Sequence, residues 1–426
     1  MVNKKLINLV AADMGYGHQR AAYPLLELGG NEIITINEYP GIPDWEREYW
    51  IKSLRSYEKI SRLKKIPLLG DVVFSVMDAF QKIQPFYPYR DLSRPTTQQK
   101  YFFGFIKKGL GRDLVEKLNP SGLPFVTTFF VAAYAAEYHN YKGDIYCIIC
   151  DTDASRAWAP IDSKNTRIKF LVPSEKVRER FAMYGVRQEN IIVTGFPLPS
   201  ENIGEKKEIA AHDLVRRISA LDPDKKYRIG YQTLWEEIAA DFSVPRQSPV
   251  TVTFAVGGAG AQKEIGALIL KKLVKMIREK EIRLNLVAGS RPEVNDYFLS
   301  ALKENGLNPG EGADIIFSPD KLDYFRKFNQ CLRKTDILWT KPSELSFYCA
   351  LGLPIIMSEP VGSQEDFNRE WLLEMGAGID SPDPGHVDEW LPDFIASGRL
   401  ARAAADSFIN AEKMGVYTIE KIFIKK

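Results

Sequence analysis

Short apolar runs rich in branched residues alternate along the chain with longer segments whose apolar residues have helical spacing. Runs that are apolar on both faces are typical of strands in a parallel sheet, because helices cover both sides of such a sheet. The pattern therefore predicts an α/β fold. The runs occupy residues 6–12, 32–37, 124–128, 144–150, 167–172, 191–195, 250–256, 283–287, 314–317, 337–340 and 354–357.

The alternation stops near residue 200 and restarts near residue 250, which separates two series of strands. Gly195 and Pro197 close the last strand of the first series. A chain of 426 residues is long enough for two domains. We expect one Rossmann-like domain over 1–199, a linker with a helical insertion over 200–249, and a second Rossmann-like domain with C-terminal helices over 250–426.

Composition and charge exclude several classes of protein. A net charge of +2 gives no reason to expect a nucleic-acid binder. Four cysteines are too few for a disulfide framework, and Cys147 and Cys150 lack a second Cys pair or a His cluster, so we expect core thiols and no metal site. No apolar run reaches the length of a membrane span, and the chain does not begin with a signal-peptide pattern. These features predict a cytoplasmic protein.

The first apolar run leads into the turn Gly15-Tyr16-Gly17-His18 and then into a helix. Glycines let the backbone approach a bound group, and the turn lies where α/β sheets bind ligands. The pattern is too incomplete for a dinucleotide fingerprint, which makes a nicotinamide cofactor a poor hypothesis. His18 is a candidate general base, because imidazole accepts protons near neutral pH. A histidine that only caps the helix is the alternative.

The second series opens in a similar way. The strand at 250–256 leads into Gly257-Gly258-Ala259-Gly260, where backbone amides can approach a diphosphate with no Cβ in the way. A simple tight turn is the alternative, and the absence of Gly-Lys-Ser/Thr excludes a Walker-type ATP site. The next strand ends at Gly289-Ser290-Arg291.

A further pair of turns follows the strands at 337–340 and 354–357. In the first, Lys341-Pro342-Ser343-Glu344-Leu345 joins a strand to a short helix, and free amides at a helix start can hold an anion. An ordinary turn capped by Ser343 is the alternative. In the second, the polar residues 359–368 include Gln364 and Glu365 and open another helix.

These motifs resemble those of the diacylglycerol glycosyltransferases and of the bacterial enzyme that adds N-acetylglucosamine to the peptidoglycan lipid precursor. The family's Gly-Gly-Gly-His turn is similar to residues 15–18, its Lys-Pro to Lys341-Pro342, its Gly-Leu-Pro to residues 352–354 and its Gln-Glu to Gln364-Glu365. The longest continuous likeness covers residues 167–198. The resemblance implies the GT-B type of fold, in which two Rossmann-like domains face each other across a cleft.

The resemblance also implies an activity, namely transfer of a hexose from a nucleotide diphosphate sugar, expected to be a UDP-sugar, to a hydroxyl acceptor. His18 or Asp153 would deprotonate the acceptor, and Gly15, Tyr16, Gly17 and Trp158 would lie on the acceptor side. Positive helix ends would stabilise the departing diphosphate, so no metal or cofactor is required. The implied donor-binding residues are Gly257, Gly258, Ala259, Gly260, Gly289, Ser290, Arg291, Lys341, Pro342, Ser343, Glu344, Leu345, Gln364 and Glu365.

The chain departs from the family pattern at four places. Ser343-Glu344 replaces a Gly-Gly pair and brings a carboxylate beside the expected diphosphate, and Cys349 stands where the family has a ribose-binding Glu. Phe129-Phe130 and Arg156 stand near positions where the family has His. Two other functions therefore stay open: a sugar-nucleotide epimerase with the same architecture, and a non-catalytic homologue that has lost its donor site.

Residues 44–118 break the strand–helix alternation and predict a helical insertion. Its segment 69–83 has an amphipathic pattern, and residues 44–112 combine aromatic with basic side chains, for instance Trp45, Tyr101, Phe105, Lys107 and Lys108. Such a surface suits the headgroup layer of an anionic membrane, where a lipid acceptor would be found. The resemblance supports a peripheral position on the inner face of the cell membrane. A helix packed on its own domain is the alternative.

Overall fold

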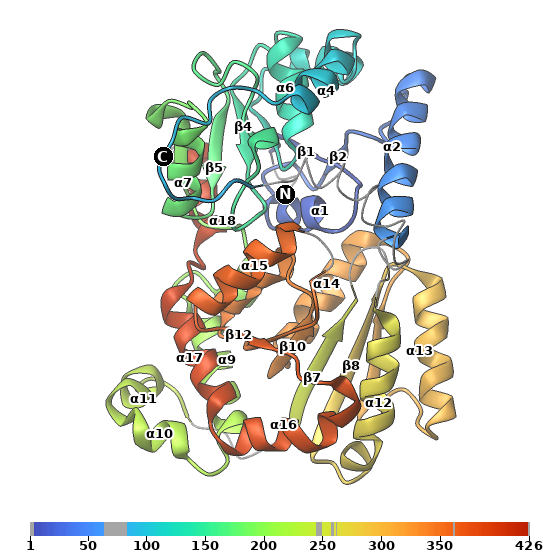
Figure 1. The fold of residues 1–426 in the computed structure, drawn as a ribbon, viewed down its shortest axis with the longest axis vertical. Coiled ribbons are helices and arrows are strands. Elements are labelled where there is room, and N and C mark those ends of the chain that lie inside the picture. The colour runs from blue at the N-terminus through green and yellow to red at the C-terminus, as the bar shows by residue number, and fades with distance from the viewer. Residues whose placement is uncertain are drawn as a thin grey trace. The chain divides into compact units, whose positions relative to one another are not determined.

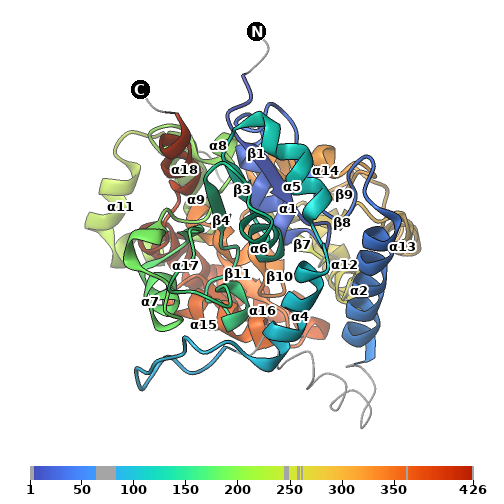
Figure 2. The same cartoon turned by 90° about the horizontal axis from the view of Figure 1, so that it is seen from above.

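The computed structural model describes residues 4–63, 83–243, 249–256, 260, 262–360 and 363–424. The chain forms two units, which are described one at a time (Figures 1 and 2). The first contains residues 1–198, 361–368 and 414–426, and the second contains residues 199–360 and 369–413. Within the described ranges, every helix falls short of the length or the hydropathy that a membrane span needs.

The first unit is built on a parallel sheet of six strands in the order β2-β1-β3-β4-β5-β6. The buried patterns of β1 and β4 match the continuous apolar runs from which they were predicted. The strand order reverses direction between β1 and β3, which pair directly. The strands are β1 (Asn8–Ala11), β2 (Ile34–Thr35), β3 (Phe125–Thr127), β4 (Ile145–Ile148), β5 (Lys169–Val172) and β6 (Ile191–Val193).

Helices cover this sheet, and α6 packs on β3 and β4 (Figure 2). The described helices of the unit are α1 (Gly17–Ala22), α2 (Asp44–Leu63), α4 (Thr97–Lys107), α5 (Arg112–Leu118), α6 (Phe130–Tyr138), α7 (Glu175–Met183) and α18 (Gly415–Phe423), with the 3-10 segments η1 (Tyr23–Leu25), η2 (Asn119–Ser121), η3 (Arg156–Trp158) and η4 (Gln188–Asn190). The amphipathic segment expected at 69–83 lies, except for Ile83, outside the described residues.

The second unit is built on another parallel sheet of six strands, in the order β12-β11-β10-β7-β8-β9. Counted along the chain, this is the 3-2-1-4-5-6 order of a dinucleotide-binding Rossmann fold, with its reversal between β7 and β10. The strands are β7 (Val250–Ala255), β8 (Ile282–Gly289), β9 (Ala313–Phe317), β10 (Ile337–Thr340), β11 (Ile355–Met357) and β12 (Gly378–Asp380).

Helices α12 and α13 run alongside β7 and β8 in Figure 1, and both pack on β8. The described helices are α8 (Ser200–Ile203), α9 (Glu208–Leu221), α10 (Lys226–Gly230), α11 (Gln232–Ala239), α12 (Lys263–Arg278), α13 (Pro292–Glu304), α14 (Lys321–Leu332), α15 (Ser363–Glu374), α16 (Val387–Ala396) and α17 (Arg399–Asn410), with the 3-10 segments η5 (Glu344–Leu351) and η6 (Pro384–His386). Residues 363–368 of α15 belong to the first unit. The predicted fold class, with two Rossmann-like parallel α/β domains, is thus confirmed.

The units differ from the predicted domain limits in two places. Residues 200–243 belong to the second unit rather than to a linker, since Leu214, Ile218 and Leu221 of α9 are part of its core. The chain also returns to the first unit at 361–368 and again from Met414, where Phe423 of α18 packs on Tyr146 with ring centroids 4.9 Å apart. Apolar periodicity indicates that a helix is buried but not which sheet buries it.

Candidate active site

In the second unit, the predicted donor turns follow the strands at which the strand order reverses. In a doubly wound sheet, ligands bind beyond the carboxyl ends of the strands at such a reversal, because the helices that follow the two strands cover opposite faces and leave a crevice. The turn after β7 begins at Val256 and the turn after β10 begins at Lys341. Thr340 Oγ1 donates to Ala255 O at 3.1 Å and holds the two strand ends together.

Gly257, Gly258 and Ala259 lie outside the described residues, whereas Gly260 is described. Gly260 has φ +70°, and a Cβ placed there would lie 3.0 Å from Val294 Cγ2 and 3.5 Å from Arg291 Cδ. Both the left-handed backbone and the close approach favour glycine at this position. The turn after β7 therefore contacts the turn after β8.

The turn after β8 contains Gly289, Ser290 and Arg291. Gly289 has φ +72°, and the pairing with β9 shifts register between Val287 and Gly289. Arg291 is the residue just before helix α13, and its Nη1 lies 3.4 Å from Glu293 Oε1. A half-buried guanidinium thus stands next to Gly260, where it can meet an anion.

The turn after β10 has the N-cap predicted from the sequence. Ser343 Oγ accepts from the N–H of Leu345 at 3.5 Å, and Lys341 and Glu344 are half-buried. The helix that follows, η5, is a 3-10 helix of eight residues, whose far end is held by Arg217 of α9. Arg217 Nη1 donates to Leu351 O and Gly352 O, both at 2.9 Å. Cys349 of η5 is completely buried, and burial raises the pKa of its thiol, so this position offers no polar group to a ribose.

Sequence reasoning missed Gln262, which links the turns after β7 and β11. Its Nε2 donates to Glu359 O at 3.1 Å, and its backbone has φ +67°. Gln364 and Glu365 lie in the first turn of α15, in the segment 361–368 that belongs to the first unit. Their role in donor binding stays a prediction.

In the first unit, His18 lies at the reversal between β1 and β3. Gly15 has φ +108° in the turn after β1, Tyr16 is buried, and Gly17 begins α1. His18 Nδ1 lies 2.7 Å from the carbonyl oxygen of Thr128, directly after β3. The sequence motifs assigned no function to Thr128. Its place at the end of a predicted strand, where α/β sheets bind ligands, could have indicated one.

Aromatic rings surround one side of His18. The ring of Phe129 meets it edge-on at a centroid distance of 4.8 Å, and that of Trp158 lies 6.1 Å away. Phe130 packs on both Phe129 and Trp158, at 5.1 and 5.2 Å. Phe129 and Phe130 thus form an apolar wall beside the imidazole at positions where the resemblance suggested a polar residue.

Asp153 is buried and forms an ion pair with Arg180. Only 2% of its surface is exposed, and its Oδ1 and Oδ2 accept from Arg180 Nε and Nη2 at 2.9 and 2.8 Å. Its Oδ1 also accepts from the N–H of Ala154 at 2.8 Å. Both carboxylate oxygens are thus engaged by a buried guanidinium, and the side chain joins the loop after β4 to α7.

Arg156, which stands near a position where the resemblance suggested His, organises the loop around Trp158. Its guanidinium donates to the carbonyl oxygens of Leu92, Ser93, Ala159 and Pro160 and to Ser163 Oγ. Burial lowers its pKa. The side chain thus acts as a buried connector of main-chain segments.

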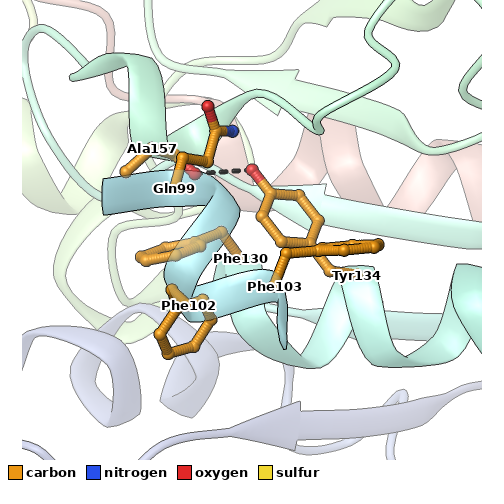
Figure 3. A pocket seen from close by; sticks show the side chains of 6 residues that line it. All are labelled: Gln99, Phe102, Phe103, Phe130, Tyr134 and Ala157. Carbon is orange, nitrogen blue, oxygen red and sulfur yellow. Dashed lines mark hydrogen bonds between the residues drawn. The ribbon is translucent and has the colours of Figure 1, made fainter. Parts of the chain in front are cut away.

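An apolar cavity of about 60 Å³ opens near the aromatic wall (Figure 3). Tyr134 OH donates to Ala157 O at 2.5 Å across its edge. Its lining consists of Gln99, Phe102, Phe103, Phe130, Tyr134 and Ala157. A larger cavity of about 470 Å³ in the second unit is lined by Val250 and Ile282, the first residues of β7 and β8. It therefore lies at the amino-terminal ends of these strands, whereas the donor turns follow the carboxyl ends.

Among the described residues, His, Cys, Asp and Glu side chains do not gather in the groups of three that a metal ion needs. Positive groups in the described part of these turns include Arg291 and Lys341, together with backbone N–H groups at helix starts. The chemistry that these residues offer is recognition of an anion.

A family model described as "Domain of unknown function (DUF6938)" matches residues 243–312 and 311–425, within the second half of the chain. The chain is 20% identical over 395 residues to the processive diacylglycerol beta-glucosyltransferase of Bacillus subtilis. The aligned region covers 89% of this chain and 84% of that protein. The processive diacylglycerol beta-glucosyltransferase of Bacillus licheniformis is 21% identical over 397 residues, with the same coverage.

Solved structures give lower similarity. The S. aureus MnaA–UDP co-structure has a TM-score of 0.45 at 13% identity, covering 84% of this chain and 86% of that one. Acinetobacter baumannii MurG has a TM-score of 0.43 at 12% identity, covering 75% and 78%. The UDP-GlcNAc 2-epimerase from Neisseria meningitidis bound to UDP-GlcNAc has a TM-score of 0.39 at 13% identity, covering 82% and 88%. These TM-scores are too low to establish a shared fold. The similarity to diacylglycerol glycosyltransferases predicted from the motifs is confirmed by the curated relatives, over nearly nine-tenths of the chain.

Proposed function

We propose that the protein is a hexosyltransferase that moves a sugar from a nucleotide diphosphate sugar, of the UDP class, to a hydroxyl acceptor. The proposal rests on one structural observation. The turns that contain Gly260 and Lys341 follow β7 and β10, the two strands between which the strand order of a Rossmann sheet reverses. Similarity to glucosyltransferases over 89% of the chain supports the same function.

The second unit supplies the donor site. The amides of the turns after β7 and β10 receive the diphosphate, and Arg291 and Lys341 contribute positive charge. Gly289 and Ser290, in the turn after β8, adjoin the nucleotide, and Pro342 and Leu345 shape the turn after β10. Glu344, which replaces a glycine of the family, takes the ribose-binding role in place of the buried Cys349, because its half-buried carboxylate can accept hydrogen bonds from vicinal hydroxyls.

The first unit supplies the base. His18 Nε2 takes the proton of the acceptor hydroxyl while the acceptor oxygen forms a bond to the anomeric carbon. The bond from that carbon to the diphosphate oxygen breaks, and its electron pair leaves with the nucleoside diphosphate. Gly15, Tyr16, Gly17 and Trp158 adjoin the base on the acceptor side, and Asp153 keeps the following loop in place through Arg180.

An aromatic and basic surface on α2 and α4 supports a lipid acceptor at a membrane. Trp45 and Tyr101 are 48% and 70% exposed, and Phe105 packs on Tyr49 with ring centroids 4.7 Å apart. Lys107 and Lys108 are exposed beside Phe103 and Phe105. Exposed aromatic rings with lysines among them suit the headgroup layer of an anionic membrane, so the acceptor is a membrane lipid and the protein is peripheral on the inner face.

Thermal unfolding with a panel of nucleotide sugars tests the donor site. A donor at 100 to 1,000 times its dissociation constant should stabilise the protein by about 3–4 kcal/mol. Release of free nucleoside diphosphate that depends on added diacylglycerol would support transfer. Conversion of the donor to an epimer without an acceptor would show an epimerase instead, and no stabilisation by any donor would leave a non-catalytic homologue.

A further inference from the structure

His18 and Thr128 are joined twice, in opposite directions. His18 Nδ1 lies 2.7 Å from Thr128 O, and Thr128 Oγ1 donates to His18 O at 2.9 Å. The two residues lie 110 positions apart in the chain. His18 lies in α1, the helix that follows β1, and Thr128 comes directly after β3, the strand that pairs with β1. Each residue thus uses its side chain to hold the main chain of the other.

The first of these bonds determines the tautomer of the ring. A carbonyl oxygen can only accept, so the proton of the neutral imidazole must be on Nδ1. The lone pair of the neutral ring is then on Nε2. The partner of Nδ1 is a neutral carbonyl, whereas the corresponding nitrogen of a catalytic-triad histidine faces a carboxylate.

The second bond holds the segment that carries the ring. His18 is the second residue of α1, a helix of six residues without a side-chain cap at its start. The Thr128 hydroxyl binds the main chain at that point, and the ring of Phe129 limits movement of the imidazole on one side. The position of Nε2 therefore depends on both the carbonyl and the hydroxyl of Thr128.

We propose that Thr128 is the positioning residue of the reaction: its carbonyl holds His18 in the Nδ1–H tautomer, and its hydroxyl fixes the first turn of α1, so that Nε2 faces the acceptor hydroxyl. This inference rests on the proposed function, since it assigns Nε2 the proton of the acceptor. Its structural half, the tautomer, can be measured without any substrate.

Long-range ¹H–¹⁵N NMR of the full-length, ¹⁵N-labelled protein above neutral pH measures that half. The chain has four histidines, which single His→Gln variants assign. His18 should show a protonated Nδ1 and an unprotonated Nε2. His139 provides an internal reference of the opposite kind, because its Nε2 lies 3.1 Å from Leu110 O and must carry the proton. An Nε2–H tautomer or an averaged mixture at His18 would overturn the inference, whatever donor the protein binds.

Variants of Thr128 test the hydroxyl. Thr128→Val keeps the carbonyl and the branched shape, and we expect kcat to fall about 10- to 100-fold with the KM for the donor unchanged. Thr128→Ser keeps the hydroxyl and should restore most of kcat. Thr194→Val is the matched control, since this buried threonine donates to Gly195 O at 2.9 Å at the end of β6. Equal loss in Thr128→Val and Thr194→Val would contradict a positioning role. If no nucleotide sugar stabilises the wild-type protein, that result counts against the proposed function and not against the tautomer of His18.

Discussion

Asp153 and Arg180 form a bidentate ion pair inside the first unit, with N–O distances of 2.9 and 2.8 Å and side-chain exposures of 2% and 0%. Asp153 comes from the loop after β4 and Arg180 from α7, so the pair joins two elements that flank β5. Removing one partner of such a pair leaves a buried, uncompensated charge, which costs more than the pair itself contributes.

We therefore predict that Asp153→Asn acts mainly on stability. The buried guanidinium loses its counter-charge, and the free energy of unfolding should fall by about 3–5 kcal/mol in urea denaturation. Asp144→Asn, which removes the exposed partner of Lys169, should change it by about 0.5 kcal/mol or less. A stable Asp153→Asn protein that had lost only kcat would return Asp153 to the role of base.

Glu46 gives the first unit a pH dependence. Its carboxyl is fully buried near the start of α2, and Oε1 accepts from the N–H of Gly111 at 3.2 Å. Burial raises its pKa from 4.5 to about 7. Between these values the folded chain keeps the proton and the unfolded chain loses it, so this group makes stability fall as pH rises, by up to about 3 kcal/mol.

Glu46→Gln should therefore be more stable than the wild type at pH 8, and the difference should shrink as the pH is lowered toward 4.5. Chemical denaturation at a series of pH values measures this. Glu48→Gln in the same helix removes an exposed carboxylate paired with Lys52 and serves as the control, with a small and nearly constant effect. If the difference in free energy of unfolding between the wild type and Glu46→Gln did not change with pH, the raised pKa of Glu46 would be refuted.

Two helical glycines should respond oppositely to alanine. A Cβ at Gly266 of α12 would lie 2.8 Å from Phe254 Cδ1 and 3.0 Å from Phe298 Cε1, whereas at Gly104 of α4 it would meet nothing within 4 Å. Gly266→Ala should destabilise by about 1–2 kcal/mol, because overpacking exceeds the gain in helix propensity. Gly104→Ala should stabilise by about 0.5–1 kcal/mol. Thermal unfolding measures both effects. If both alanine variants were more stable than the wild type, Gly266 of α12 would not pack closely against Phe254 of β7.

Donor binding should depend on the positive charge at the turn after β10. Lys341→Gln removes a cation at that turn while keeping a side chain of similar length, and we expect the dissociation constant of UDP to rise about tenfold, which corresponds to about 1.4 kcal/mol. Titration calorimetry measures the change. Lys303→Gln, on an exposed position of α13, is the control for the loss of one charge. Equal affinities for all three proteins would exclude Lys341 from the donor site.

Membrane association should depend on the exposed aromatic side chains of α2 and α4. Sedimentation with vesicles that contain phosphatidylglycerol should pellet the wild type at low salt and less of it at high salt. The double variant Trp45→Ser/Tyr101→Ser should pellet less, because the rings that enter the headgroup layer are gone. Ile229→Ser changes an apolar residue of α10 that is 71% exposed and should pellet like the wild type. No pelleting of the wild type at any salt concentration would refute the membrane surface.

The sequence by itself determined the strands and the turns that follow them. Runs such as 250–256 and 337–340 are short and rich in branched and aromatic residues, as buried parallel strands are, so β7 and β10 could be placed within a residue or two. Gly260 and Ser343 were also recognisable, because a left-handed backbone and a helix N-cap are local demands that few residue types meet.

The tertiary structure decided which of these elements are neighbours. The sheet pairs β1 with β3 across more than a hundred residues and so brings Thr128 to His18. Tertiary packing also brings Asp153 to Arg180 and returns α18 to the first unit. Local pattern could not supply these pairings, because it reports whether a side chain is buried and on which face of its own element. The tautomer of His18 and the ion pair of Asp153 depend on partners far along the chain, and only the assembled sheet selects those partners.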